Sequence, residues 1–124
     1  LSSASSNSVT VAVETDYALN FDGTNDFVLI EDHADFDFSS NYTLEAWIFT
    51  EEFDWLSGII SKYQTSGANG WILRLHSVEP FDGIEFDELK SPTGILELNQ
   101  WVHVAAVNNS GQRYLYINGK NKKR

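Results

Sequence analysis

The sequence Ala18-Leu19-Asn20-Phe21-Asp22-Gly23-Thr24-Asn25-Asp26-Phe27-Val28 alternates apolar and polar residues and then reaches a turn. From Tyr17 onward, apolar side chains occupy every second position, which is the period of a strand with one buried face. Asp22-Gly23-Thr24-Asn25 supplies residues that tolerate positive φ, and the run that begins at Phe27 is apolar on both faces. The stretch therefore predicts a strand, a turn and a return strand.

The rest of the chain also consists of short strand-like runs separated by turn residues. Runs of β-prone residues are separated by Gly, Asn, Asp and Ser, and no long segment keeps a helical period. The further strands are expected at residues 9–13, 43–49, 58–63, 71–76, 84–87, 101–107 and 114–117. Short strands with this punctuation indicate an all-β sandwich or barrel.

The alternation also predicts which side chains form the core. In the strand at 71–76, Leu73 and Leu75 are expected to point inward, and Arg74 and His76 outward. The predicted core comprises Leu19, Phe21, Leu44, Ala46, Ile48, Trp101, His103 and Ala105, together with Trp47 and Trp71.

The composition is that of one acidic globular domain. The 124 residues include 8 Lys and Arg against 18 Asp and Glu, so the net charge is −10, and 42% of the residues are hydrophobic. A surface this acidic repels phosphates, so we expect no nucleic-acid partner. The chain has no Cys for a disulfide. No apolar run approaches the roughly 20 residues of a membrane span, so no membrane insertion is expected.

Five motifs follow one another between residues 17 and 120. They are Ala18-Leu19-Asn20-Phe21-Asp22-Gly23-Thr24-Asn25-Asp26-Phe27-Val28, Thr43-Leu44-Glu45-Ala46-Trp47-Ile48, Ile59-Ile60-Ser61-Lys62, Gln100-Trp101-Val102-His103-Val104-Ala105 and Leu115-Tyr116-Ile117-Asn118-Gly119. Together they closely resemble the laminin G-like jelly roll of the concanavalin A-like lectin/glucanase superfamily. The resemblance implies an antiparallel jelly-roll sandwich that serves as a binding module rather than a catalyst.

In that family, several strands follow the Asn-Gly hairpin, including a late acidic strand beside the opening one. Here the hairpin is followed by Lys120-Asn121-Lys122-Lys123-Arg124, which we read as a solvated tail. We therefore expect a sandwich that is incomplete at its C-terminus and is completed by neighbouring domains or another chain. Residues 1–16 are predicted to be a Ser-rich linker or the tail of a preceding domain, and residues 17–124 the N-terminal portion of the sandwich.

The turn after the first clear strand offers oxygen ligands for a metal ion. Asp22, Asn25 and Asp26 place two carboxylates and an amide around Gly23, and calcium is bound by such oxygens. The resemblance implies calcium at the sandwich rim in many members, with some ligands from the late acidic strand. Calcium takes six to eight oxygens and this run supplies fewer, so a plain turn capped by Asp26 stands beside the calcium site as an alternative.

Residues 51–55 predict a contact with a ligand. They form an acidic loop that contains Phe53 and Trp55, and an aromatic side chain in a loop can stack on a sugar ring or anchor a protein. A lid over an open sheet edge is the alternative role for this loop.

Glu85 and Asp87 share one face of a short strand, as catalytic carboxylates of the glucanase branch do. The third position on that face is Leu89, so the acid/base partner is missing. We interpret the two acids as a solvated strand edge and expect no catalytic residues.

These observations predict a non-catalytic extracellular recognition or adhesion module that binds a glycan or a protein. The module is expected to be part of a larger secreted or cell-surface protein. Two alternatives stay open: a truncated β-glucanase-like glycoside hydrolase, and a structural spacer of a surface filament that binds no ligand.

Overall fold

The computed structural model describes residues 4–7, 10–13, 17–62 and 70–122. Val9, Tyr63, Lys123 and Arg124, which belong to predicted strands and to the predicted tail, lie outside these residues. The chain divides into two compact units, unit 1 at Leu1–Phe36 and unit 2 at Asp37–Arg124, and each unit has its own sheets.

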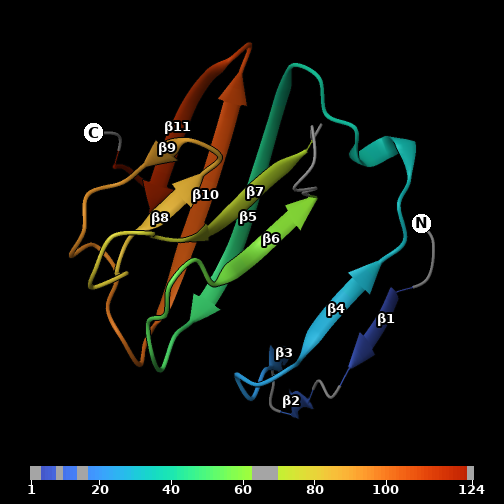
Figure 1. Ribbon diagram of the computed structural model, residues 1–124, viewed down its shortest axis with the longest axis vertical. Helices are drawn as coiled ribbons and strands as arrows, with labels where there is room; N and C mark the ends of the chain where they lie inside the picture. Colours follow the sequence, from blue (N-terminus) through green and yellow to red (C-terminus); the bar gives the residue numbers. More distant parts are fainter. Residues whose placement is uncertain (1–3, 8–9, 14–16, 63–69, 123–124) are drawn as a thin grey trace. The chain divides into compact units, whose positions relative to one another are not determined.

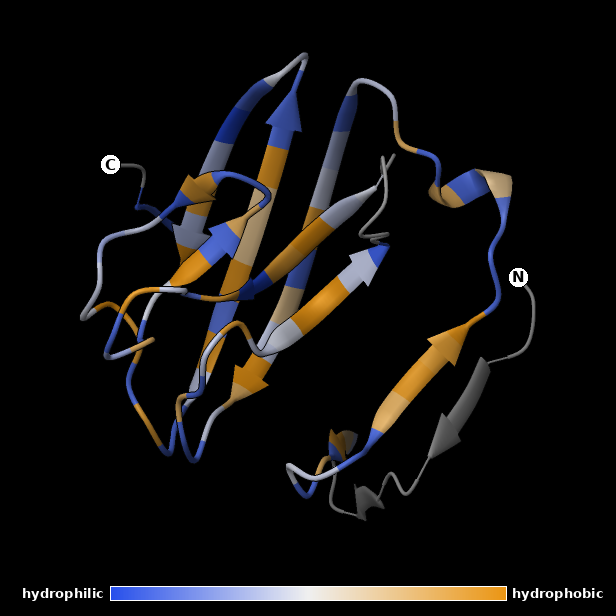
Figure 2. Cartoon of the chain, in the orientation of Figure 1, coloured by the Kyte–Doolittle hydropathy of each residue, from blue (hydrophilic) through white to orange (hydrophobic). Residues whose placement is uncertain are grey.

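Unit 1 contains two small antiparallel sheets. β1 (Ala4–Asn7) pairs with β4 (Phe27–Ile30), and β2 (Thr10–Val13) pairs with β3 (Tyr17–Asn20), before the short 3-10 helix η1 (Ala34–Phe36). The return strand is thus confirmed as a strand, but β3 and β4 do not pair with each other. Figure 2 shows β4 as apolar along its whole length, and its four side chains are exposed.

Leu19 and Phe21 are not core residues in this structure, contrary to the prediction. Each is 48% exposed. A two-stranded sheet has little opposing surface of its own, so alternation along one strand is not enough to bury a face.

Unit 2 contains two four-stranded antiparallel sheets (Figure 1). The first sheet has the order β12-β11-β10-β5, and the second has the order β6-β7-β8-β9. The first comprises β5 (Asn41–Phe49), β10 (Trp101–Asn109), β11 (Gln112–Ile117) and β12 (Lys120–Asn121). The second comprises β6 (Gly58–Lys62), β7 (Trp71–Leu75), β8 (Ile84–Phe86) and β9 (Leu89–Lys90). The chain leaves the first sheet after β5 and returns to it at β10, which confirms the predicted jelly-roll type of sandwich.

The core of unit 2 lies between the two sheets. Its most completely buried apolar side chains are Leu73, Ile84, Phe86, Val104, Ala106 and Leu115. β5 has the predicted register, because Leu44, Ala46 and Ile48 are the more buried positions and the residues between them are exposed. Trp71 is buried as predicted.

β10 has the opposite register from the predicted one. Val102 and Val104 are buried, while Trp101 is 52% exposed and His103 lies on the same side as Trp101. The pairing explains this, since Val104 stands opposite Ala46 and directly opposed residues of antiparallel strands share a face. Ala105 is buried as predicted, although it lies on the outer face of the sheet.

Trp47 is 65% exposed, which also corrects its assignment to the core. The inward positions of β5 are Leu44, Ala46 and Ile48, so Trp47 must lie on the outer face.

Two tight turns hold the first sheet together. Ser110 and Gly111 join β10 to β11, and Asn118 and Gly119 join β11 to β12. All four residues have positive φ, as type I′ turns require, and the twist of such turns matches that of paired strands. The segment that begins at Lys120 is therefore a paired strand at its start and not a tail throughout.

Four aromatic rings, one from the segment before β5 and three from the two sheets, form a cluster. Phe38 stacks on Tyr42 and on Trp71, with ring centroids 4.8 and 5.2 Å apart, and the Tyr42 ring meets Phe86 edge-on at 6.0 Å. The Arg113 guanidinium lies 5.7 Å from the centre of the Phe86 ring. Tyr42 and Arg113 belong to the first sheet and Phe86 to the second, so this cluster joins the two layers.

Candidate functional site

The predicted calcium ligands lie in unit 1, in the turn between β3 and β4. Gly23 takes a φ of 83°, which a glycine adopts without steric cost. Asp22 Oδ1 accepts a hydrogen bond of 2.8 Å from the Thr24 N–H, and Asp26 Oδ2 accepts one of 2.9 Å from the Asp22 N–H. One oxygen of each carboxylate therefore holds the turn itself.

The remaining oxygens of this turn leave a partial ligand set. Asp26 Oδ1 is buried and has no hydrogen-bond donor, which is compatible with a cation. Among the described residues, however, no group of three or more His, Cys, Asp or Glu side chains is arranged to bind a metal. Since calcium takes six to eight oxygens, Asp22, Asn25 and Asp26 fit a part of such a site and do not complete one. Calcium binding stays a prediction.

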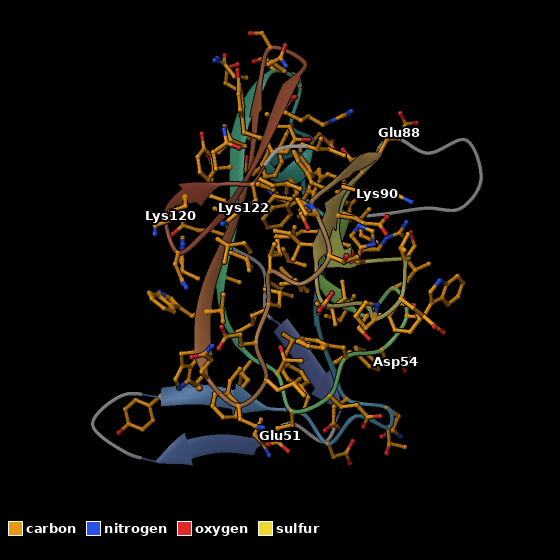
Figure 3. The ribbon with its side chains drawn as sticks, turned by 90° about the vertical axis from the view of Figure 1, so that its left-hand side faces the viewer. Glu51, Asp54, Glu88, Lys90, Lys120 and Lys122 are labelled. Carbon is orange, nitrogen blue, oxygen red and sulfur yellow. The ribbon has the colours of Figure 1, made fainter. Side chains whose placement is uncertain are left out.

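The predicted ligand contacts Phe53 and Trp55 lie in unit 2, in the loop between β5 and β6. Phe53 is partly buried, whereas Trp55 is 61% exposed. Asp54 holds the loop in shape, because its carboxylate accepts the Trp55 N–H at 2.7 Å and its carbonyl accepts the Ser57 hydroxyl at 3.3 Å. Figure 3 shows Glu51 and Asp54 in this loop. The Trp55 ring is therefore presented to solvent by an ordered loop.

The carboxylates of the β8 segment are not the solvated edge that the sequence predicted. Glu85 is only 2% exposed, with one oxygen 3.6 Å from Arg74 Nη2 and the other accepting the Ser77 N–H. The pair forms because Arg74 and Glu85 stand directly opposite each other on β7 and β8. Both oxygens of this buried carboxylate therefore have a partner within the second sheet or in the loop after β7.

Asp87 is engaged in the same way. Its Oδ1 accepts the Ile72 N–H at 3.0 Å, and its Oδ2 lies 3.4 Å from Arg113 Nη2. The contact with Arg113 links the second sheet to β11 of the first. Glu85 therefore stabilises the second sheet, and Asp87 joins that sheet to the first.

His76 is buried, which corrects its predicted outward position. Its Nδ1 accepts the Val78 N–H at 2.9 Å, so Nε2 must carry the proton that it shares with the Ser91 carbonyl at 3.0 Å. The ring thus ties the end of β7 to the segment after β9 and leaves neither nitrogen for a ligand.

A surface that the sequence analysis missed lies on the outer face of the first sheet. We call it the aromatic platform and define it by Trp47, Phe49, Trp101 and His103. The Trp47 and His103 rings are 5.1 Å apart, and the Phe49 and Trp101 rings are 5.6 Å apart. Both contacts are direct cross-strand pairs of β5 and β10.

The Glu45 side chain borders the platform. His103 Nε2 lies 3.8 Å from Glu45 Oε1, and the Glu45 side chain is largely exposed. The two platform residues of β5 could have been predicted from the sequence, because inward Leu44, Ala46 and Ile48 require outward Trp47 and Phe49. The two residues of β10 were missed because the predicted register of that strand was wrong.

The two four-stranded antiparallel sheets of unit 2 define a β-sandwich module of the jelly-roll type. The chain belongs to the laminin G-like family of the concanavalin A-like lectin/glucanases superfamily, whose family model matches residues 22–124. The match begins in the Asp22 turn and includes the whole of unit 2. Comparisons with curated proteins and with solved structures gave no match. In this family, the sandwich is a module that binds carbohydrate or protein. None of the helices in the described part of the chain is both long and apolar enough to cross a membrane.

Proposed function

We propose that this chain is a non-catalytic recognition module of a secreted or cell-surface protein. Its proposed ligand is a glycan or a protein, and Phe53 and Trp55 are proposed ligand contacts. The observation that carries the non-catalytic part is the engagement of Glu85 with Arg74 and the Ser77 N–H. A general acid must keep its carboxyl within reach of the substrate, and this carboxyl is buried.

The non-catalytic role is tested by incubating the chain with laminarin-type β-glucans and measuring released reducing ends. We expect none above the level of a heat-denatured sample. Hydrolysis that disappears in Glu85→Gln would overturn the proposal, because it would make the carboxylate a catalytic group.

The recognition role is tested on an array of neutral, sialylated and sulfated glycans and, in parallel, on cell-surface proteins of the source organism. We expect saturable binding to a defined ligand that Trp55→Ala weakens about tenfold, as loss of a central aromatic contact does. Val78→Ala, which truncates another exposed side chain of unit 2, is the matched control and should bind normally. Absence of any specific ligand would favour the spacer alternative.

Calcium is a proposed ligand of the Asp22–Asp26 turn, and titration calorimetry tests it. We expect heat of binding in the millimolar range that is lost in Asp26→Ala, because Asp26 Oδ1 is a buried oxygen without a donor. Asp35→Ala, which removes an exposed carboxylate elsewhere in unit 1, should leave the heat unchanged. No heat at millimolar calcium would rule out a site in this chain.

Location outside the cell is tested by antibody labelling of intact and permeabilised source cells. Family membership supports a secreted or surface protein. We expect labelling without permeabilisation, or the protein in the medium, whereas labelling only after permeabilisation would contradict the proposal.

A further inference from the structure

We propose that the aromatic platform of Trp47, Phe49, Trp101 and His103 binds a neutral polysaccharide chain by ring stacking. The inference deepens the proposed recognition function and rests on it. It adds the outer face of β5 and β10 to the ligand contacts that are proposed in the loop after β5.

The first argument is the arrangement of the rings. The two ring pairs follow each other two residues apart along the strands, which is roughly 7 Å at the rise of a β-strand. Two linked pyranose rings are longer than this spacing, so one oligosaccharide can reach both ring pairs. The rings within each pair meet at 59° and 57°, so they are tilted against each other and are not stacked face to face.

The second argument is the exposure of the apolar surface. Trp47 and Trp101 are both more than half exposed, and Phe49 is exposed beside them. Large aromatic groups left in water are costly unless a partner covers them, and contiguous exposed patches mark binding surfaces. The apolar C–H face of a sugar ring matches such a surface while its hydroxyls remain in water.

The third argument concerns the polar groups beside the rings. The platform adjoins the exposed Glu45 carboxylate, which lies 3.8 Å from His103. Carboxylate and imidazole groups beside an aromatic face suit sugar hydroxyls, which both donate and accept hydrogen bonds.

The fourth argument concerns the charge of the ligand. The chain has a net charge of −10, and a field of this sign repels sulfated or uronate polymers. A neutral chain incurs no such repulsion, so we assign neutral glycans to the platform.

The test is electrophoresis of the full chain in native gels that contain a soluble polysaccharide. Laminarin, hydroxyethylcellulose and galactomannan are the neutral probes, and polygalacturonate and heparin are the anionic probes. We expect retardation by at least one neutral probe and by neither anionic probe. Trp47→Ala and Trp101→Ala should each raise the apparent Kd about tenfold, as for a buried aromatic anchor, and the double variant should migrate as in a gel without polysaccharide.

Controls keep a loss of fold apart from a loss of binding. Each variant should keep the melting temperature of the wild type within a few degrees, since the replaced rings are exposed. Tyr17→Ala removes another exposed aromatic side chain, in β3, and should be retarded like the wild type. Trp47→Phe and Trp101→Phe should retain part of the retardation, because an aromatic face remains.

Four results would overturn the inference. The first is migration unaffected by all three neutral probes, and the second is retardation by the anionic probes alone. The third is loss of binding in Trp55→Ala with normal binding in both platform variants, which leaves the proposed recognition function intact and moves its site to the loop. The fourth is a dimer in sedimentation that the Trp47 and Trp101 variants abolish, with no polysaccharide bound, since it makes a second copy the partner of the platform.

Discussion

Tyr42 shows how a single side chain can couple the two sheets of unit 2. Its ring contacts Phe38 and Phe86, while its hydroxyl lies in the field of Asp87 and Arg113. Burial raises the pKa of Tyr42 above its ordinary value, the Asp87 carboxylate raises it further, and Arg113 partly opposes the shift. The neutral phenol is thus the form that the folded state prefers.

This preference predicts a specific loss of stability at alkaline pH. The unfolded Tyr42 ionises near about pH 10, while the folded one keeps its proton to higher pH. The free energy of unfolding should therefore be unaffected below this value and should fall as the pH rises through the folded pKa. In urea melts between about pH 8 and 11, the stability of the wild type relative to Tyr42→Phe should decline above pH 10. A difference that is constant or grows with pH would contradict this.

Leu44 provides a second test at the residue scale. It is buried at the centre of β5, so Leu44→Ala should lower the free energy of unfolding by about 2–5 kcal/mol through lost contacts and a residual cavity. Thr43→Ala, one residue away on the exposed face, should change it by less than about 0.5 kcal/mol. If denaturant melts gave the same loss of stability for both variants, the assigned register of β5 would be wrong.

At the scale of elements, the segment around β8 and β9 is held by polar groups as well as apolar ones. The Ser91 hydroxyl accepts the Ile84 N–H at 3.0 Å and donates to the Pro92 carbonyl at 2.8 Å. His76 adds its bond to the Ser91 carbonyl. Gly83 precedes β8, and its carbonyl accepts the His76 N–H at 3.0 Å. The backbone segments approach so closely here that a side chain on Gly83 has no room.

We therefore expect Gly83→Ala to be destabilising. An added Cβ would lie 2.7 Å from both the Pro92 carbonyl oxygen and the Ser91 hydroxyl, and backbone cannot move aside cheaply. The loss in free energy of unfolding should be about 1–3 kcal/mol. Gly58→Ala is the control, since nothing lies within 4 Å of its Cβ position, and it should be neutral or slightly stabilising. If Gly83→Ala left the stability unchanged in thermal and denaturant melts, the backbone around residue 83 would be able to shift at little cost, which would contradict this prediction.

At the scale of the whole molecule, the two edge strands of the first sheet differ in how well they are protected against pairing with strands of other molecules. In the first sheet, β12 carries Lys120, with Lys122 just beyond it (Figure 3). At the other edge, β5 is nine residues long, contains no Lys or Pro, and among the described strands is hydrogen-bonded only to β10. Strand edges of this kind pair with other strands, which agrees with the expectation from the sequence that another domain or chain completes the sandwich.

The isolated chain should therefore self-associate in sedimentation at tens of micromolar. Thr43→Lys places a charge on the β5 edge strand and should shift the population toward monomer, as edge lysines do in natural sheets. Gln112→Lys adds the same charge at the start of β11, and its self-association should equal that of the wild type. A monodisperse, cooperatively melting monomer of the wild type would show that the sheets are closed without a further strand.

Much of the local structure of this chain could be predicted from its residues. The Asp-Gly and Asn-Gly turns, the inward face of β5 and the five family motifs all depend on nearest neighbours and on spacing, which are explicit in the sequence. The loop position of Trp55 was predictable for the same reason. Strand pairing between distant segments was not, so the partners of β3 and β4 differed from the simplest prediction.

The sequence by itself determined that the chain is an all-β member of its family, while tertiary structure decided which faces are buried. β10 has apolar residues on both faces, so Trp101 and Val102 were equally good core residues until pairing with β5 and packing of the second sheet selected Val102. Glu85 and His76 were predicted to be solvated because the sequence shows that they are polar but does not show which groups they contact. Burial is a property of what covers a side chain, and the groups that cover these residues come from segments that no local pattern brings together.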